Sequence, residues 1–90
     1  MGTEVMCGKG WDKLIFPLKD AAEATGAKVL QVKEKFGGLR FYVADAPRWL
    51  EDMIDQMERL SYHVCEQCGK EGKLRQGGWL KTLCEECNSK

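Results

Sequence analysis

Two Cys-x2-Cys pairs in the last third of the chain constrain its fold more than any other feature. Cys65 and Cys68 form the first pair, Cys84 and Cys87 form the second, and fifteen residues separate them. This spacing is typical of a four-cysteine zinc site, because each turn places two thiolates roughly 2.3 Å from a shared metal. It therefore predicts one structural Zn²⁺ ion held by these four residues. Iron is the alternative metal, and a red protein would reveal it.

A structural metal suits a chain of 90 residues. A chain this short buries only roughly 60–65% of its unfolded surface, whereas a structural zinc adds an apparent ~10–16 kcal/mol to folding. We see no export signal at the N-terminus, so the paired cysteines predict metal ligands in a reducing, cytoplasmic compartment rather than disulfides. No apolar run approaches ~18 residues, and we expect no membrane span.

Residues 11–25 have apolar side chains at the three- and four-residue steps of an amphipathic helix. We expect Trp11 to be a core residue at the start of this helix, with Asp12 as its N-cap, and Gly26 to end it. Pro17 removes an amide donor, which predicts a tight first turn or a kink before it.

Residues 46–63 give the clearest helical pattern. Asp45 is the expected N-cap, and Pro47 fits the first turn. The apolar stripe expected to pack in the core consists of Trp49, Leu50, Met53, Ile54, Met57, Leu60 and Val64.

Residues 28–44 alternate between apolar and polar side chains on both sides of Gly37-Gly38, which predicts a β-hairpin with a two-residue turn. In this register Lys35 lies opposite Arg40, and Lys33 lies opposite Tyr42. The expected core face carries Leu30, Val32, Phe36, Leu39, Phe41 and Val43.

The opposite face of this hairpin carries the candidate partner-binding residues Lys33, Lys35, Arg40 and Tyr42. Like charges opposite each other destabilise a hairpin by some tenths of a kcal/mol, so their gathering has no evident structural reason. The simpler interpretation is a solvated strand face, and the functional one is a surface for phosphates or for an acidic protein patch. The chain as a whole has a formal charge of zero, unlike a general nucleic-acid binder.

Residues 69–83 again contain two short strand patterns around a Gly-Gly turn, which together with the cysteine pairs predicts a zinc ribbon. We expect Trp79 to pack over the metal module, with an exposed anchor for a partner as the alternative. Cys7 is expected to be a half-buried apolar residue. His63 is expected at the helix end rather than on the metal, because four cysteines already complete the tetrahedron.

These patterns together predict an α+β fold. Residues 1–64 would form two helices packed on a β-hairpin, and residues 65–90 would form the four-cysteine zinc ribbon. Because the second helix runs almost directly into Cys65, the two parts are expected to pack as one unit.

The segments Val32-Lys-Glu-Lys-Phe-Gly-Gly-Leu-Arg-Phe-Tyr42 and Gly78-Trp-Leu-Lys-Thr-Leu-Cys-Glu-Glu-Cys87 carry a resemblance. The chain is similar to small uncharacterised phage and prophage proteins that join such a hairpin to a C-terminal zinc ribbon. The resemblance covers most of the chain and implies a bacterial cytoplasmic setting, but no catalytic residues. Small phage proteins of this size often bind host proteins, including those of defence systems.

Three functions follow as hypotheses. The first is a non-enzymatic protein that binds and modulates or inhibits a host protein. The alternative is a regulator that binds nucleic acid through the basic hairpin face. Catalysis is disfavoured, because four thiolates close the metal's shell and leave no position for water. The oligomeric state stays open, since a second copy can complete a thin core.

Overall fold

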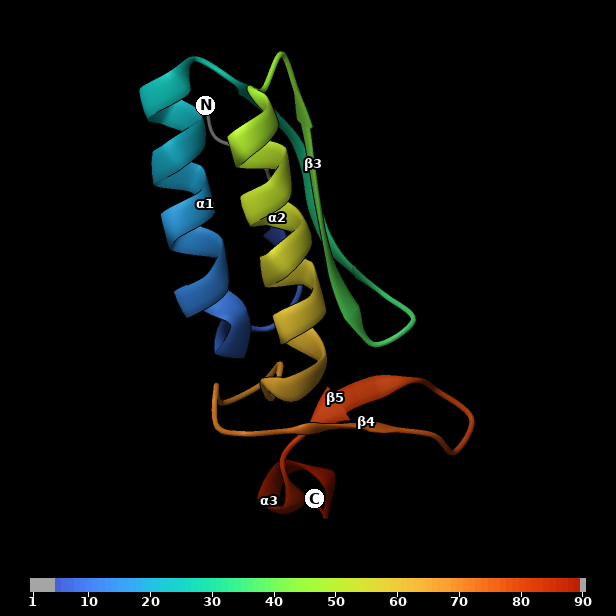
Figure 1. The fold of residues 1–90 in the computed structure, drawn as a ribbon. Coiled ribbons are helices and arrows are strands. Elements are labelled where there is room, and N and C mark those ends of the chain that lie inside the picture. The colour runs from blue at the N-terminus through green and yellow to red at the C-terminus, as the bar shows by residue number, and fades with distance from the viewer. Residues whose placement is uncertain (1–4, 90) are drawn as a thin grey trace.

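The computed structural model describes residues 5–89, and it is a small α+β structure in which two long helices lie on one side of a three-stranded sheet (Figure 1). A second, two-stranded sheet lies across one end of this helix–sheet body. The elements in chain order are β1 (Val5–Met6), η1 (Lys9–Trp11), α1 (Asp12–Thr25), β2 (Lys28–Lys35), β3 (Gly38–Ala44), α2 (Arg48–Leu60), η2 (Ser61–His63), β4 (Lys73–Arg75), β5 (Lys81–Leu83) and α3 (Glu85–Asn88).

The core lies between the two helices and the inner face of the sheet. Trp11, Ile15 and Leu18 of the α1 region are fully buried, and they meet Val32 of β2 and Leu50 of α2. The predicted first helix is confirmed, and Gly26 ends it, but its N-cap is Trp11 and not Asp12, which is the first helical residue. It continues through Pro17, and it is preceded by the tight 3₁₀ turn η1.

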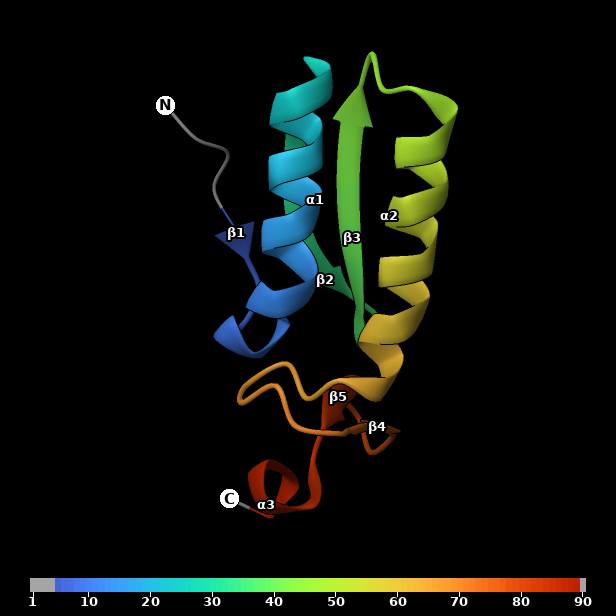
Figure 2. The same cartoon turned by 60° about the vertical axis from the view of Figure 1, so that its left-hand side comes forward.

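One strand was not predicted. The Gly-rich residues 1–10 have no periodic pattern and predict irregular structure, and residues 1–4 lie outside the described residues. Within the described part, Val5 and Met6 form β1, which pairs in parallel with Val32 and Lys33 of β2. Two residues are too few to give an alternating pattern, so this strand has no signature in the sequence. β2 is the central strand, with β1 on one edge and β3 on the other; in Figure 2, β1 and β3 appear on opposite sides of α1.

The predicted hairpin is confirmed, but its turn lies one residue earlier than expected. Phe36 and Gly37 are the two turn residues, with φ of 54° and 85°. Lys35 therefore pairs with Gly38 instead of Arg40, and Lys33 pairs with Arg40 instead of Tyr42. The cross-strand partner of each of these two lysines differs by two positions from the expected one. Because side chains alternate between the two faces of a strand, a change of two positions leaves Lys33, Lys35, Arg40 and Tyr42 on the same face.

Two residues predicted on the core face are exposed instead. Leu30 is 59% exposed, and it lies at an irregularity of the pairing between Val29 and Gln31. The inserted residue interrupts the alternation that the sequence pattern assumes. Phe36 is 64% exposed because it belongs to the turn and not to a strand.

The second helix is also confirmed, but three details differ. Asp45 is not the N-cap: it has a φ of 60°, and Pro47 is the N-cap, with its carbonyl accepting the N–H of Leu50. Pro47 is itself extended, with φ of −69° and ψ of 159°, so α2 begins at Arg48. Trp49 and Leu60, expected in the core, are 54% and 45% exposed. The buried stripe is narrower than the apolar one and centres on Leu50 and Ile54.

The outer edge of β3 is closed by side chains from the end of α2 and from η2. The Leu39 N–H donates to the Ser61 hydroxyl at 2.9 Å, and the Phe41 N–H donates to the Glu58 carboxylate at 2.8 Å. Burial raises the pKa of Glu58, although the Phe41 N–H acts in the opposite direction. These bonds supply acceptors to an edge that would otherwise be open to another strand.

The C-terminal part contains the predicted second hairpin, formed by β4 and β5. Trp79, expected to pack over the metal module, lies in the loop between these strands and is 80% exposed. The loop extends beyond the short strands, so its tip does not fold back on the cysteines (Figure 1). None of the helices in the described part of the chain is both long and apolar enough to span a bilayer.

Ser61→Ala should destabilise the protein by about 1–3 kcal/mol, because Ser61 is fully buried and its loss leaves the Leu39 N–H without an acceptor. Chemical denaturation measures this change. Ser89→Ala is the matched control, since Ser89 is exposed and should change stability by less than about 0.5 kcal/mol. Equal stability of the two variants would contradict the role of Ser61.

Candidate metal centre

The structure brings the four predicted cysteines together at the end of the molecule that carries the small sheet. Cys65 and Cys68 lie on the turn after η2, whereas Cys84 and Cys87 lie at the end of β5 and in α3. All four sulfur atoms lie within 4.8 Å of one another, and the sulfurs of Cys68 and Cys84 are 3.6 Å apart. A tetrahedron with metal–sulfur bonds of about 2.3 Å has edges of about 3.8 Å. The cluster therefore has the dimensions needed to hold one metal ion.

Backbone hydrogen bonds set the direction of the thiols. In the first turn, the Gly69 N–H donates to the Cys65 carbonyl at 2.9 Å, and the Cys65 N–H donates to the Lys70 carbonyl at 2.7 Å. Gly69 has a φ of 84°, as expected from its place after the first pair. In the second turn, the Cys87 N–H donates to the Cys84 sulfur at 3.3 Å. Both turns close around the same point.

The electrostatics of the cluster favour partial ionisation. Burial acts to raise the pKa of Cys65, but hydrogen bonds from three backbone N–H groups outweigh it and lower this pKa to about 6. The Cys87 N–H likewise lowers the pKa of Cys84. The pKa of Cys87 is raised to about 12, first by its hydrogen bond with Cys84. The thiols that are still protonated would lose their protons when a bound cation compensates the negative charge of the thiolates. Metal binding here should therefore release protons.

The donor set determines which ions fit. Four soft thiolates suit Zn²⁺ or iron in tetrahedral sulfur coordination, and poorly suit the hard ions Mg²⁺ and Ca²⁺. His63, which the sequence left as a possible ligand, is not part of the cluster. Cys7 also lies outside it, half-buried against the core, and burial raises its pKa to about 11. Such a thiol is poorly reactive near neutral pH.

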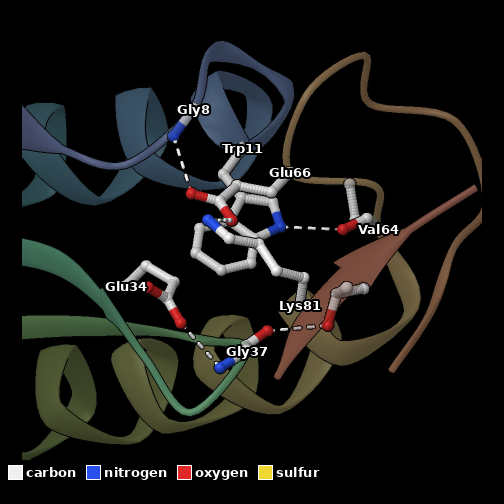
Figure 3. Close-up of polar contacts among 8 residues, drawn as sticks. Gly8, Trp11, Glu34, Gly37, Val64, Glu66 and Lys81 are labelled. Atoms are coloured by element: carbon white, nitrogen blue, oxygen red, sulfur yellow. Dashed lines mark hydrogen bonds and ion pairs between the residues drawn. The ribbon is translucent and has the colours of Figure 1, made fainter. Parts of the chain in front are cut away.

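The first cysteine turn is bonded to the start of α1 (Figure 3). The buried Trp11 indole N–H donates to the Val64 carbonyl at 2.8 Å. The Gly10 N–H donates to the Glu66 carbonyl at 2.6 Å, and the Gly8 N–H donates to the Glu66 carboxylate at 2.9 Å. These bonds join residues more than fifty positions apart, so the metal turn is fixed on the helical body.

Glu66 is a feature that sequence reasoning missed. Its side chain is buried, and Oε1 has no hydrogen-bond partner, although the Lys81 ammonium lies 3.7 Å away as an ion pair. A glutamate between the two cysteines of the first pair looks like a solvated residue in the sequence. Only the fold reveals that it faces Gly8 and Lys81 (Figure 3).

The candidate partner-binding residues lie together on the sheet face opposite the helices, which we name the outer face and define as Lys33, Lys35, Arg40 and Tyr42. Lys33 and Arg40 are directly paired, and Tyr42 pairs with Gln31. The Lys33 ammonium lies 5.8 Å from the centre of the Tyr42 ring. The four residues therefore share one surface, as the alternation predicted.

The sequence analysis missed a groove beside this face. It is lined by Glu34, Lys35, Phe36, Gly78, Trp79 and Leu80, and it encloses about 450 Å³. The two aromatic residues come from the tips of the two hairpins. The signal in the sequence was that each lies next to a turn glycine, where a large apolar side chain has little to pack against.

Comparison with known proteins adds no assignment. The chain matches no protein-family model, no curated protein and no solved structure.

Removing the metal, or one ligand, should unfold the C-terminal module. Cys68→Ser should lower bound metal from one equivalent per chain and abolish the cooperative melt of the wild-type protein, because metal binding and folding are coupled in small sites. Metal analysis and thermal unfolding with and without a chelator measure both effects. Cys7→Ser is the matched control, since Cys7 lies outside the cluster and should leave metal content unchanged. An unchanged melt after metal removal would contradict the prediction.

Proposed function

We propose that this protein is a non-enzymatic binding module whose C-terminal part is a zinc ribbon with one structural Zn²⁺ ion. The support is the donor set: four thiolates within 4.8 Å of one another fill a tetrahedral shell and leave no position for a reacting water. The only histidine of the sequence, His63, lies outside that set. The metal then acts as a clamp that joins the turn after η2 to the end of β5 and to α3.

The observation that carries the proposal is the charge distribution between the two layers. The outer face gathers Lys33, Lys35 and Arg40 on the side of the sheet away from α1 and α2. Residues 44–64, which include α2, carry five acidic and two basic side chains. A neutral protein with one basic face is suited to an acidic patch of defined size, because the matching potentials guide and orient the complex.

The partner in this proposal is a protein of the bacterial host, which the module modulates or inhibits on binding. Zero net charge supports a protein partner over a nucleic-acid polymer, whose binding depends mainly on bulk positive charge. The resemblance to small phage and prophage proteins supports the same setting. The module would then act within the cytoplasm of a bacterial cell.

Nucleic acid is the second candidate, and one observation favours it. Cations lie beside aromatic rings at two neighbouring places: Lys33 is 5.8 Å from the Tyr42 ring centre, and Lys35 is 5.6 Å from the Phe36 ring centre. Proteins that bind single strands combine such rings for base stacking with cations for phosphates.

Charge reversal on the outer face tests the proposal. Lys33→Glu with Lys35→Glu should weaken partner binding at least about thirtyfold without lowering the melting temperature. Proteins captured from a bacterial lysate by the wild-type and variant chains are compared by mass spectrometry, and the differential partner is then purified and titrated calorimetrically.

The matched control is Arg48→Glu with Arg59→Glu, which makes the same charge change on α2. Both arginines are exposed, at 87% and 79%, and their ion pairs with Asp52 and Asp55 contribute little to stability. This control should bind like the wild type. Unaltered binding after reversal of the outer face would refute the proposal. A salt-dependent shift of labelled DNA or RNA would select the second candidate instead.

A further inference from the structure

The groove between the two hairpin tips is open to solvent and has aromatic walls. Phe36 from the β2–β3 turn and Trp79 from the β4–β5 loop both line it, and they are 64% and 80% exposed. Its volume of about 450 Å³ falls in the range of small-ligand sites and is larger than a single amino-acid side chain requires. Both hairpins extend to the same side of the molecule in Figure 1.

Direct contacts between the hairpins fix the groove. The buried Thr82 hydroxyl of β5 donates to the Gly37 carbonyl at 2.6 Å. Gly37 has a φ of 85°, which favours glycine, and a Cβ atom there would lie 2.4 Å from a methyl carbon of Leu74, whose side chain would have to shift. The bases of the two hairpins are therefore joined before any partner arrives, which lowers the entropic cost of binding.

Phe36 has a backbone conformation that a phenylalanine disfavours. Its φ of 54° lies in the left-handed region, where the first position of this kind of turn prefers asparagine or glycine. Burial of the Phe36 ring does not offset the cost of this backbone conformation, because the ring is mostly exposed. A strained and exposed aromatic residue indicates a role in contact rather than in folding.

The charge around the groove selects the partner's chemistry. The Lys35 ammonium lies 5.6 Å from the Phe36 ring centre, and Lys35 belongs both to the groove lining and to the outer face. Glu34 also lines the groove, but its carboxylate accepts the Gly37 N–H at 2.7 Å and so takes part in the turn. The groove lining therefore holds one cation and one anion, and of the two only the cation, Lys35, is continuous with the basic outer face.

We propose that this groove receives an apolar side chain from an acidic segment of the protein partner, with Phe36 and Trp79 as the walls and Lys35 as the contact for a flanking carboxylate. This proposal rests on the proposed function, since it names where and how the same partner binds. Exposed Trp residues that are held rigidly are frequent energetic centres of protein interfaces.

Three fluorescein-labelled heptapeptides test the groove on the full, zinc-loaded chain by fluorescence anisotropy. The first has a phenylalanine flanked on each side by two acidic residues, the second replaces this phenylalanine with serine, and the third replaces the acids with lysines. We expect the first to bind with a dissociation constant of about 0.1 mM. The serine peptide should bind at least about tenfold more weakly, and the lysine peptide should not bind.

Variants then locate the site. Trp79→Ser should weaken the first peptide at least about fivefold. Phe36→Asn should also weaken binding of the first peptide at least about fivefold. It should raise the melting temperature by about 4–8 °C, because asparagine tolerates the left-handed backbone conformation better than phenylalanine does. Trp49→Ser is the matched control: Trp49 is also more than half exposed, but it lies on α2, so its loss should leave peptide binding unchanged.

Several results would overturn the groove proposal. These are no binding of the first peptide at 1 mM peptide, equal binding of the serine peptide, an equal loss in Trp49→Ser, or a Phe36→Asn variant that binds normally. Tighter binding of a fifteen-residue oligothymidylate than of the acidic peptide would replace the protein partner with nucleic acid. If charge reversal on the outer face removes the partner but Trp79→Ser and Phe36→Asn retain it, the proposed function stands and the groove proposal fails.

Discussion

The bond between the Trp11 indole and the Val64 carbonyl is the contact on which the arrangement of the two parts depends. Trp11 is fully buried and belongs to the main core, while Val64 is the residue before the first cysteine. The same side chain thus completes the core and sets the position of the metal turn. Glu66 adds two further bonds to the start of the chain through its carbonyl and its carboxylate. Because these groups are buried, losing one partner leaves the other unsatisfied, which makes the junction specific as well as stable.

The two edges of the main sheet are already hydrogen-bonded, and this limits where the cations of the outer face can lie. The short β1 covers part of one side of β2, and Ser61 and Glu58 satisfy the free amides of β3 on the other. With both helices on the inner face, the cations of β2 and β3 have only the opposite side available (Figure 2). Placing like charges there costs some tenths of a kcal/mol per pair. The proposed binding of an acidic partner explains why the chain keeps these like charges together despite that cost.

Much of the fold could be predicted from the sequence, because the helices and the hairpin have long periodic patterns and the cysteines have a specific spacing. The wrong predictions concern places where a single residue sets the position of a turn or the pairing of a strand. Nothing local indicates that Phe36 rather than Gly38 enters the turn; the approach of Tyr62 to Gly38, where a Cβ would lie 2.3 Å from the tyrosine ring, comes from a distant residue. The irregularity at Leu30 and the exposure of Trp79 depend likewise on packing. The cysteine cluster was predictable because its four residues lie in two short turns whose spacing is visible in the sequence.

The long separation between Trp11 and Val64 also affects how the chain can acquire its structure during synthesis. Gly8, Gly10 and Trp11 are made early, but their partners at Val64 and Glu66 emerge from the ribosome more than fifty residues later. Until then the Trp11 indole N–H can donate only to water, and the core lacks α2. Domains often fold from the N-terminus as they are synthesised, whereas here the early segment must wait. The helical body and the metal turn are thus expected to form in one late, concerted step.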